Sequence, residues 1–407
     1  MIRTPVYMDY HATTPVDSRV LEAMLPFFSE KFGNPSSRQH RFGWIAEEAV
    51  ESCRENIARC IGSESKEIVF TSGATESSNL ALKGTAEAYK QKGSHIVTVQ
   101  TEHKSVLDTC RRLEKQGFEV TYLPVDEYGI VDLDRFRASL RPSTILVSIM
   151  IANNEIGSIQ SVDEIGKLCR EHAVFFHTDA TQAVGKIPVD VQKMHIDLMS
   201  FNAHKIYGPK GIGALYVRRS NPKVKIAMQM DGGGHERGMR SGTLNVPGIV
   251  GLAKALELSV QSMSEETIRL RILRDRMFDA FTGQLDEVFL NGHPTNRLPN
   301  NLNVSFLYAE DNALMMSMKD IAVSTGSACS TADPEPSHVL KALRLPQERL
   351  HSAIRFGLGR FTTEEEVEYV IGRVVENVRK LRQLSPGYSS RRGKNKELVT
   401  IQRGVTL

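Results

Sequence analysis

Short apolar runs alternate with helical patterns over the first half of the chain. Seven runs rich in Val, Ile, Leu and Phe are the right length for buried strands: 68–70, 95–99, 120–123, 145–149, 174–176, 198–201 and 212–217. Amphipathic helical patterns separate most of them, as at 76–91 and 105–116. This alternation indicates crossover connections and a mostly parallel seven-stranded sheet with helices on both faces. Such sheets bind ligands beyond the carboxyl ends of their strands.

The second half has a different arrangement. A long helical pattern at 247–281 leads to strand patterns at 302–306 and 353–356, a helical pattern at 312–318 and a final helix at 363–384, opened by a capping sequence at Thr363. We therefore predict an α/β fold in which 16–260 form a large domain, and 1–15 with 261–386 a smaller α/β domain. The segment 387–407 loses periodicity and gains basic residues, which predicts a solvated, flexible tail.

Composition narrows the class of protein. The 407 residues are 41% hydrophobic and 24% charged, as in ordinary globular proteins, and the net charge of +3 predicts no direct nucleic-acid binding. No apolar stretch approaches the ~20 residues of a membrane span, and the N-terminus has no apolar signal region. Five cysteines without a CxxC pair argue against disulfides and structural zinc. We expect a cytoplasmic protein.

One cysteine differs from the other four. Cys53, Cys60, Cys110 and Cys169 fall on apolar helical stripes, where buried thiols are expected. Cys329 instead lies in the segment 323–336, which is rich in Ser, Thr, Gly, Ala and Pro. An accessible loop thiol carries an oxidation risk, so chemistry explains it better than packing.

Three segments after buried strands could carry chemistry. The turn at 70–76 places small residues before a helix, which suits an anion but also serves as a structural cap. Asp179 follows an apolar run and would face the ligand crevice, or cap the next segment. Lys205 follows another apolar run and stands between His204 and a Gly-Pro turn. Desolvation there would lower the pKa of Lys205 and favour a Schiff base. A phosphate site, an acid and a Schiff-base lysine together are the groups that pyridoxal 5′-phosphate requires.

The chain resembles a fold-type I pyridoxal-phosphate enzyme. The resemblance rests on these three segments and on the motifs at 7–15, 32–35, 101–103, 153–157, 240–243 and 352–360. More specifically, the chain resembles a cysteine desulfurase of the IscS/NifS type, almost from end to end.

The resemblance implies a role for each matching residue. Lys205 would hold the cofactor and move protons, and His103 would stack on its ring and act as an acid or base. Arg355 and Asn34 would bind the substrate carboxylate, and Thr243 would reach the cofactor phosphate of the other subunit of a homodimer. The remaining implied cofactor contacts are Ala74, Thr75, Asn154, Asp179, Gln182, Asn202 and His204.

The implied reaction converts L-cysteine to L-alanine. Cys329 would attack the substrate sulfur, keep it as a persulfide and pass it to acceptor proteins for iron–sulfur cluster assembly or thio-modification. As a persulfide, Cys329 would also be a transient iron–sulfur ligand. The chain departs from the family pattern at Asn202 and Ala203, where Ser-Gly is common. It departs again after Pro386, where the usual aromatic-rich tail that docks the iron–sulfur scaffold is missing.

The sequence is also compatible with other functions. On the same fold, a selenocysteine lyase would act on a heavier analogue, and an aminotransferase would leave Cys329 without a role. A desulfurase could instead serve nucleic-acid modification, by tRNA thiolation or DNA phosphorothioation. A protein of a different class, an assembly platform for sulfur acceptors, would not need the intact set of Lys205, His103, Asp179 and Arg355.

Overall fold

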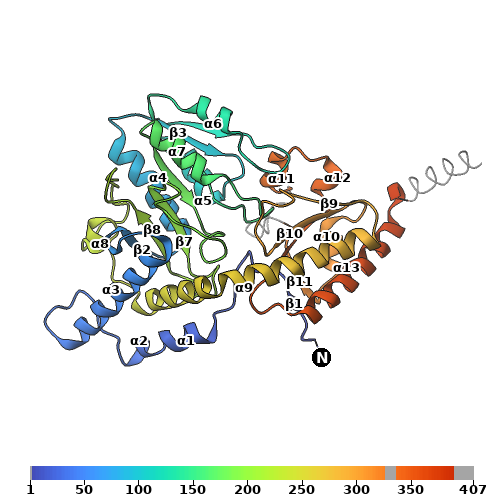
Figure 1. The fold of residues 1–407 in the computed structure, drawn as a ribbon, viewed down its shortest axis with the longest axis horizontal. Coiled ribbons are helices and arrows are strands. Elements are labelled where there is room, and N and C mark those ends of the chain that lie inside the picture. Colours follow the sequence, from blue (N-terminus) through green and yellow to red (C-terminus); the bar gives the residue numbers. More distant parts are fainter. Residues whose placement is uncertain (1, 326–335, 389–407) are drawn as a thin grey trace, which may run out of the picture.

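The computed structural model describes residues 2–325 and 336–388, and these residues form three sheets with helices around them (Figure 1). The largest sheet has seven strands in the order β2-β8-β7-β6-β5-β3-β4. Its strands are β2 (Ile68–Thr71), β3 (His95–Val99), β4 (Glu119–Leu123), β5 (Thr144–Ser148), β6 (Phe175–Asp179), β7 (Leu198–Asn202) and β8 (Gly213–Val217). Only β8 runs against its two neighbours, so the predicted mostly parallel sheet is confirmed.

Helices cover both faces of this sheet, as the continuous apolar runs predicted. Alternate strand residues point to opposite sides: Val69 packs with α4 and α5, whereas Ile68 and Phe70 pack in the core that includes α3 and α9. The helices of this part are α1 (Ser18–Met24), α2 (Pro26–Ser29), α3 (Arg41–Ile61), α4 (Ala74–Tyr89), α5 (Lys104–Glu114), α6 (Leu133–Ser139), α7 (Val162–Glu171) and α8 (His235–Gly238).

The second part of the structure is built on a three-stranded antiparallel sheet with its own apolar core. Its elements are β9 (Val288–Leu290), β10 (Asn301–Phe306), α10 (Asp311–Ser317), α11 (His338–Ala342), α12 (Gln347–Leu350), β12 (Ala353–Gly357) and α13 (Glu364–Leu384). The N-terminal strand β1 (Val6–Tyr7) pairs in parallel with β11 (Ile321–Ala322), so the start of the chain lies in this part, as expected.

A single long helix joins the two parts. α9 (Val246–Gln284) crosses the molecule in Figure 1, and both apolar cores include residues from it. Its first turn is fixed by Asn245, whose side chain accepts a hydrogen bond from the Gly248 N–H, and by a proline at the helix start. The predicted domain boundary between residues 260 and 261 falls inside this helix and stays a prediction.

Two sequence expectations need correction. The strand expected at 174–176 is β6, which continues to Asp179, because the polar His177 is fully buried and its ring nitrogens contact Ser148 Oγ (2.8 Å) and Ser200 Oγ (2.9 Å) on the neighbouring strands. Cys110 and Cys169 are buried as expected, but Cys53 and Cys60 on α3 are only half-buried. They lie at the margin of the core stripe rather than within it.

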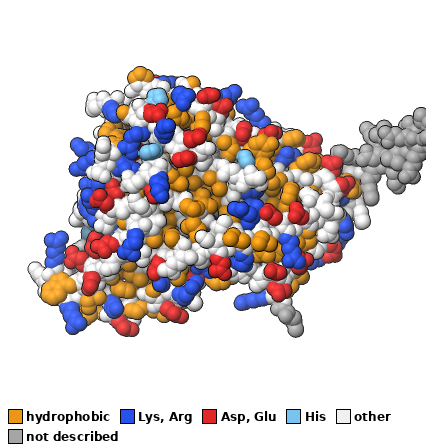
Figure 2. All heavy atoms as spheres, viewed as in Figure 1, with side chains coloured by type: hydrophobic (Ala, Val, Ile, Leu, Met, Phe, Trp, Pro, Cys, Tyr) orange, Lys and Arg blue, Asp and Glu red, His pale blue; other side chains and the backbone are white. Residues whose placement is uncertain are grey.

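The described part of the chain contains no helix that is both long and apolar enough to cross a membrane. Basic and acidic side chains are interspersed over most of the face shown in Figure 2, in keeping with the small net charge of +3.

Candidate active site

A cavity of about 330 Å³ lies at the carboxyl edge of the central sheet. Its walls come from residues at or just after the ends of five strands that point the same way. Thr75 follows β2, His103 follows β3, Asn154 follows β5, Asp179 ends β6, and Asn202 ends β7. Sequence reasoning placed the ligand site at this edge, and the cavity has that position.

Most of the predicted site residues line this cavity. They are Ala74, Thr75, His103, Asn154, Asp179, Gln182, Asn202, His204, Lys205 and Arg355. Two others do not: Asn34 and Thr243 are exposed and lie outside the residues that line it. Cys329 lies outside the described residues.

The start of α4, which lines the cavity, is suited to an anion. α4 begins at Ala74, and Gly73 before it has φ +158°, a conformation that side chains with a Cβ rarely adopt. The first backbone N–H groups of a helix lack partners within the helix and carry partial positive charge. Thr75 and His204 add side chains at the cavity wall. Desolvation and the cations Lys205, Lys210 and Lys186 lower the pKa of His204 to about 4, so its ring is neutral at pH 7.

The cavity wall also holds groups that could fix a polar ring. Asp179 is buried, and its Oδ1 accepts a hydrogen bond from the Thr181 N–H at 2.9 Å. Asn202 Oδ1 and Thr181 Oγ1 are buried and have no hydrogen-bond partner among residues 2–325 and 336–388. Buried polar atoms of this kind cost free energy unless a ligand pairs with them.

Lys205 is held by the N-terminal segment. Its Nζ donates to the carbonyl oxygens of His11, at 2.7 Å, and Ala12. The lysine thus enters the cavity beside Gln182, whose amide Nε2 also donates to the His11 carbonyl at 3.0 Å. The departure at Ala203 is accommodated, because this residue is fully buried with an ordinary negative φ, and a residue with a Cβ fits there.

Arg355 has an N–H donor that no described residue accepts. It is 1% exposed, and its Nη1 and Nη2 donate to Asn154 O (3.0 Å) and Asp9 Oδ1 (2.7 Å). Its buried Nε has no partner in the described parts of the chain. A guanidinium with unused N–H groups beside a cavity can bind a carboxylate through two hydrogen bonds.

Sequence reasoning missed several cavity residues. Glu155, His338 and His11 line it. Ser337 Oγ donates to Glu155, and His338 Nε2 contacts the Glu102 carbonyl oxygen at 2.9 Å. The sequence feature that could have identified these three residues is their position, because each lies in or next to one of the segments 7–15, 153–157 and 323–336 that already contain candidate site residues or motifs.

Burial controls the charge of the acids in this region. Desolvation raises the pKa of Glu155 to about 7, against smaller opposing effects of Ser337 and Arg355. Glu102 is fully buried, and desolvation followed by repulsion from Asp179 raises its pKa well above the ordinary value. Both acids hold a proton more tightly than a free glutamate does.

Comparison with known proteins identifies the class to which this fold and cavity belong. The class-V aminotransferase family model matches residues 6–370. Cysteine desulfurase IscS of Anaeromyxobacter sp. is 59% identical over 387 residues, covering 95% of this chain and 96% of that protein. The counterpart from Methylobacillus flagellatus is 56% identical over 386 residues, covering 95% of each.

Solved structures agree with these matches. A NifS-like protein superposes with a TM-score of 0.85 at 40% identity, covering 91% of this chain and 98% of that one. SspA in complex with cysteine gives a TM-score of 0.78 at 38% identity, covering 88% and 100%. The chain belongs to the class-V aminotransferase family and, within it, to the cysteine desulfurases.

Enzymes of this family depend on pyridoxal 5′-phosphate, and the cavity fits that group. The helix start at Ala74 and Thr75 suits a phosphate, and Asp179 suits a pyridinium nitrogen. Asn202 Oδ1 and Thr181 Oγ1, which have no partner in the described segments, leave polar atoms for a ligand, and Lys205 supplies the amine that the cofactor aldehyde needs.

Proposed function

We propose that this protein is a cysteine desulfurase that takes sulfur from L-cysteine, leaves L-alanine and carries the sulfur on Cys329. The observation that carries the proposal is the single cavity in which Lys205, His103, Asp179, Gln182 and Arg355 meet at the strand ends. This set contains an amine for the cofactor aldehyde, an acid–base group and a carboxylate-binding cation.

Each residue has a task that follows from its position. Pyridoxal 5′-phosphate, when bound, supplies an electron sink for the bonds of the substrate Cα. Asp179 and Gln182 hold the ring, while Ala74, Thr75, Asn202 and His204 hold the phosphate. Arg355 binds the substrate carboxylate, Lys205 and His103 move protons at the substrate carbons, and Asn154 orients the ring.

Cys329 is the proposed sulfur acceptor. Its thiolate attacks the substrate sulfur, a sulfur–sulfur bond forms and the substrate Cβ–S bond breaks. The electron pair stays with the organic fragment, which takes a proton at Cβ and leaves as alanine. None of the four described cysteines lines the cavity, and desolvation raises the pKa of each, to about 11 for Cys53. Their thiols are therefore poor nucleophiles at neutral pH.

The full enzyme in this proposal is a cytoplasmic homodimer. Thr243 is exposed and does not line the cavity of its own chain, which suits a residue that completes a site across an interface. The sulfur would then pass to acceptor proteins for iron–sulfur cluster assembly, in line with the resemblance to the IscS type. Cys329 in persulfide form would be the transient cluster ligand on that route.

Product analysis tests the proposed reaction. Purified protein with L-cysteine should yield alanine, and sulfide when a reductant is present, whereas Lys205→Ala should lose the yellow colour and both products. A keto acid in place of alanine would mean transamination instead. A higher kcat/KM for selenocysteine than for cysteine in a competition assay would mean a selenocysteine lyase.

A further inference from the structure

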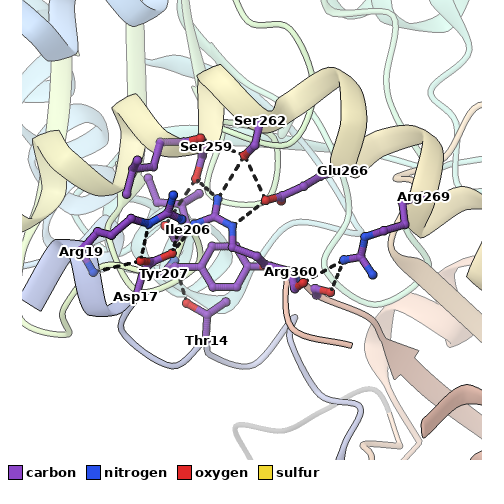
Figure 3. Close-up of polar contacts among 12 residues, drawn as sticks. Thr14, Asp17, Arg19, Ile206, Tyr207, Ser259, Ser262, Glu266, Arg269 and Arg360 are labelled. Atoms are coloured by element: carbon purple, nitrogen blue, oxygen red, sulfur yellow. Dashed lines mark hydrogen bonds and ion pairs between the residues drawn. The ribbon is translucent and has the colours of Figure 1, made fainter. Parts of the chain in front are cut away.

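Arg360 lies at the junction of three segments that are far apart in the sequence (Figure 3). It follows β12, the strand that carries Arg355. Its Nη1 pairs with Asp17 Oδ2 at 2.9 Å, and its Nε pairs with Glu266 Oε1 on α9 at 2.5 Å. The Arg360 side chain is 9% exposed and that of Asp17 4%, so this pairing is shielded from water and salt.

The same arginine holds Tyr207, two residues beyond Lys205. The guanidinium lies over the Tyr207 ring, 4.2 Å from its centroid. The Arg360 backbone N–H donates to Tyr207 Oη at 2.6 Å. Tyr207 has φ +67°, a left-handed conformation that is strained for a residue with a Cβ, so surrounding contacts must hold it.

The N-terminal segment fixes the backbone on both sides of Lys205. Thr14 Oγ1 donates to the His204 carbonyl oxygen at 3.0 Å and accepts from the Tyr207 N–H at 2.8 Å. The Asp17 N–H donates to the Tyr207 carbonyl oxygen at 2.9 Å. Asp17 therefore connects Arg360 to the lysine loop, in addition to the direct contacts of Arg360 with Tyr207 (Figure 3).

We propose that Arg360 is a positioning residue for Lys205, which couples the loop of the cofactor lysine to the strand that carries Arg355. The inference rests on the proposed function, in which Lys205 holds the cofactor and Arg355 binds the substrate carboxylate. Four residues separate Arg355 from Arg360, so one short segment sets the spacing between the lysine loop and the proposed carboxylate-binding arginine.

Arg269 provides a matched control. It lies on α9 and donates to the carbonyl oxygens of Thr362 (2.7 Å), Gly359 (3.2 Å) and Arg360 (2.9 Å), so it ties the same loop to the same helix. No described contact joins it to Asp17 or Tyr207. Arg269→Met should therefore lower the melting temperature without disturbing Lys205.

The test compares Arg360→Met, Arg360→Lys and Arg269→Met as holoenzymes. Lysine keeps the charge, which favours folding, but cannot bridge two carboxylates and stack at once. Both Arg360 variants should lower kcat about tenfold to a hundredfold, because small misplacements of reacting groups are costly, with KM for L-cysteine changed less than about threefold. Arg269→Met should keep wild-type kcat.

A spectroscopic readout without substrate separates positioning from stability. The pH midpoint of the cofactor absorption band reports the proton held where Lys205 joins the cofactor. In the Arg360 variants this pH midpoint should rise by about one unit. Nearby cations disfavour the proton, and a less firmly held Lys205 lies less close to the cations Lys186 and Arg355. Asp179, His11 and His204 also line the cavity around it and are the same in all variants.

Folded Arg360 variants with wild-type midpoint and kcat would overturn the inference, as would equal changes in Arg269→Met. Borohydride reduction followed by peptide mass analysis distinguishes this failure from failure of the proposed function. A reduced pyridoxyl group on a lysine other than Lys205 would reject the function itself.

Discussion

At the scale of single residues, the cavity holds groups whose protonation is set by burial. Glu155 is the clearest case, with a pKa of about 7 caused mainly by desolvation. Between the ordinary pKa of 4.5 and this value, the folded protein keeps the proton that the unfolded chain loses. The Glu155 contribution to the free energy of unfolding therefore falls as pH rises from about 4.5 to about 7, by on the order of 3 kcal/mol.

Glu155→Gln removes this titration and leaves an oxygen to accept the Ser337 hydrogen bond. Relative to wild type, the variant should gain stability as pH rises from 4.5 to 7, with a constant difference above that range. Urea unfolding at several pH values measures this difference. A difference that stays flat over the whole range would show that Glu155 titrates normally.

Arg355 gives a prediction for substrate binding. Arg355→Lys keeps a positive charge but loses the planar pair of donors, so KM for L-cysteine should rise about tenfold to a hundredfold. The cofactor absorption band should remain, since Arg355 does not hold the cofactor in the proposal. An unchanged KM, measured by steady-state kinetics, would remove Arg355 from the substrate site.

At the scale of elements, the helices and strands mostly follow from local pattern. The final helix is an example: Thr363 Oγ1 accepts from the Glu366 N–H, and Glu366 Oε2 accepts from the Thr363 N–H, which is the predicted cap of α13. Thr363→Ala should lower the free energy of unfolding by about 1 kcal/mol, without changing kcat. Urea unfolding with activity assays checks this, and a loss of activity at full stability would mean that α13 acts on the site.

The hydrophobic pattern did not predict the short strands or the polar end of a longer one. β1, β9 and β11 have two or three residues, too few for a periodic signal, and β1 and β11 form by pairing across 315 residues of sequence (6 to 321). The polar end of β6 was missed because His177 is buried through hydrogen bonds to two neighbouring strands, which only the tertiary structure supplies. His11 and Arg360 are further cases, since their contacts depend on how the N-terminus and α9 pack.

At the scale of the whole molecule, the strand-end rule predicted where the cavity lies, and the resemblance predicted most of its lining. Thr243 and Asn34, which the resemblance assigns to the site, are exposed and do not line the cavity of a single chain. The proposed dimer accounts for the position of Thr243, and it can be tested by mixing defective subunits.

A heterodimer of a Lys205→Ala subunit and a Thr243→Ala subunit should contain one intact site if Thr243 acts across the interface. At limiting cofactor, it should regain about half of the wild-type activity, whereas each homodimeric variant stays weak. Activity and bound cofactor of the purified heterodimer measure this. Two defective sites, with no recovery, would show that Thr243 serves the site of its own chain.

In the proposed reaction, sulfur leaves L-cysteine for Cys329 while alanine forms, and both products can be measured in a single turnover without reductant. After mixing with L-cysteine, the Cys329 peptide should be heavier by one sulfur atom in mass analysis, with one alanine released per modified site. Cys329→Ala should keep the cofactor band and form no protein-bound sulfur. Sulfur found on Cys53, Cys60, Cys110 or Cys169, or alanine formed with no sulfur on the protein, would contradict the transfer of sulfur to Cys329.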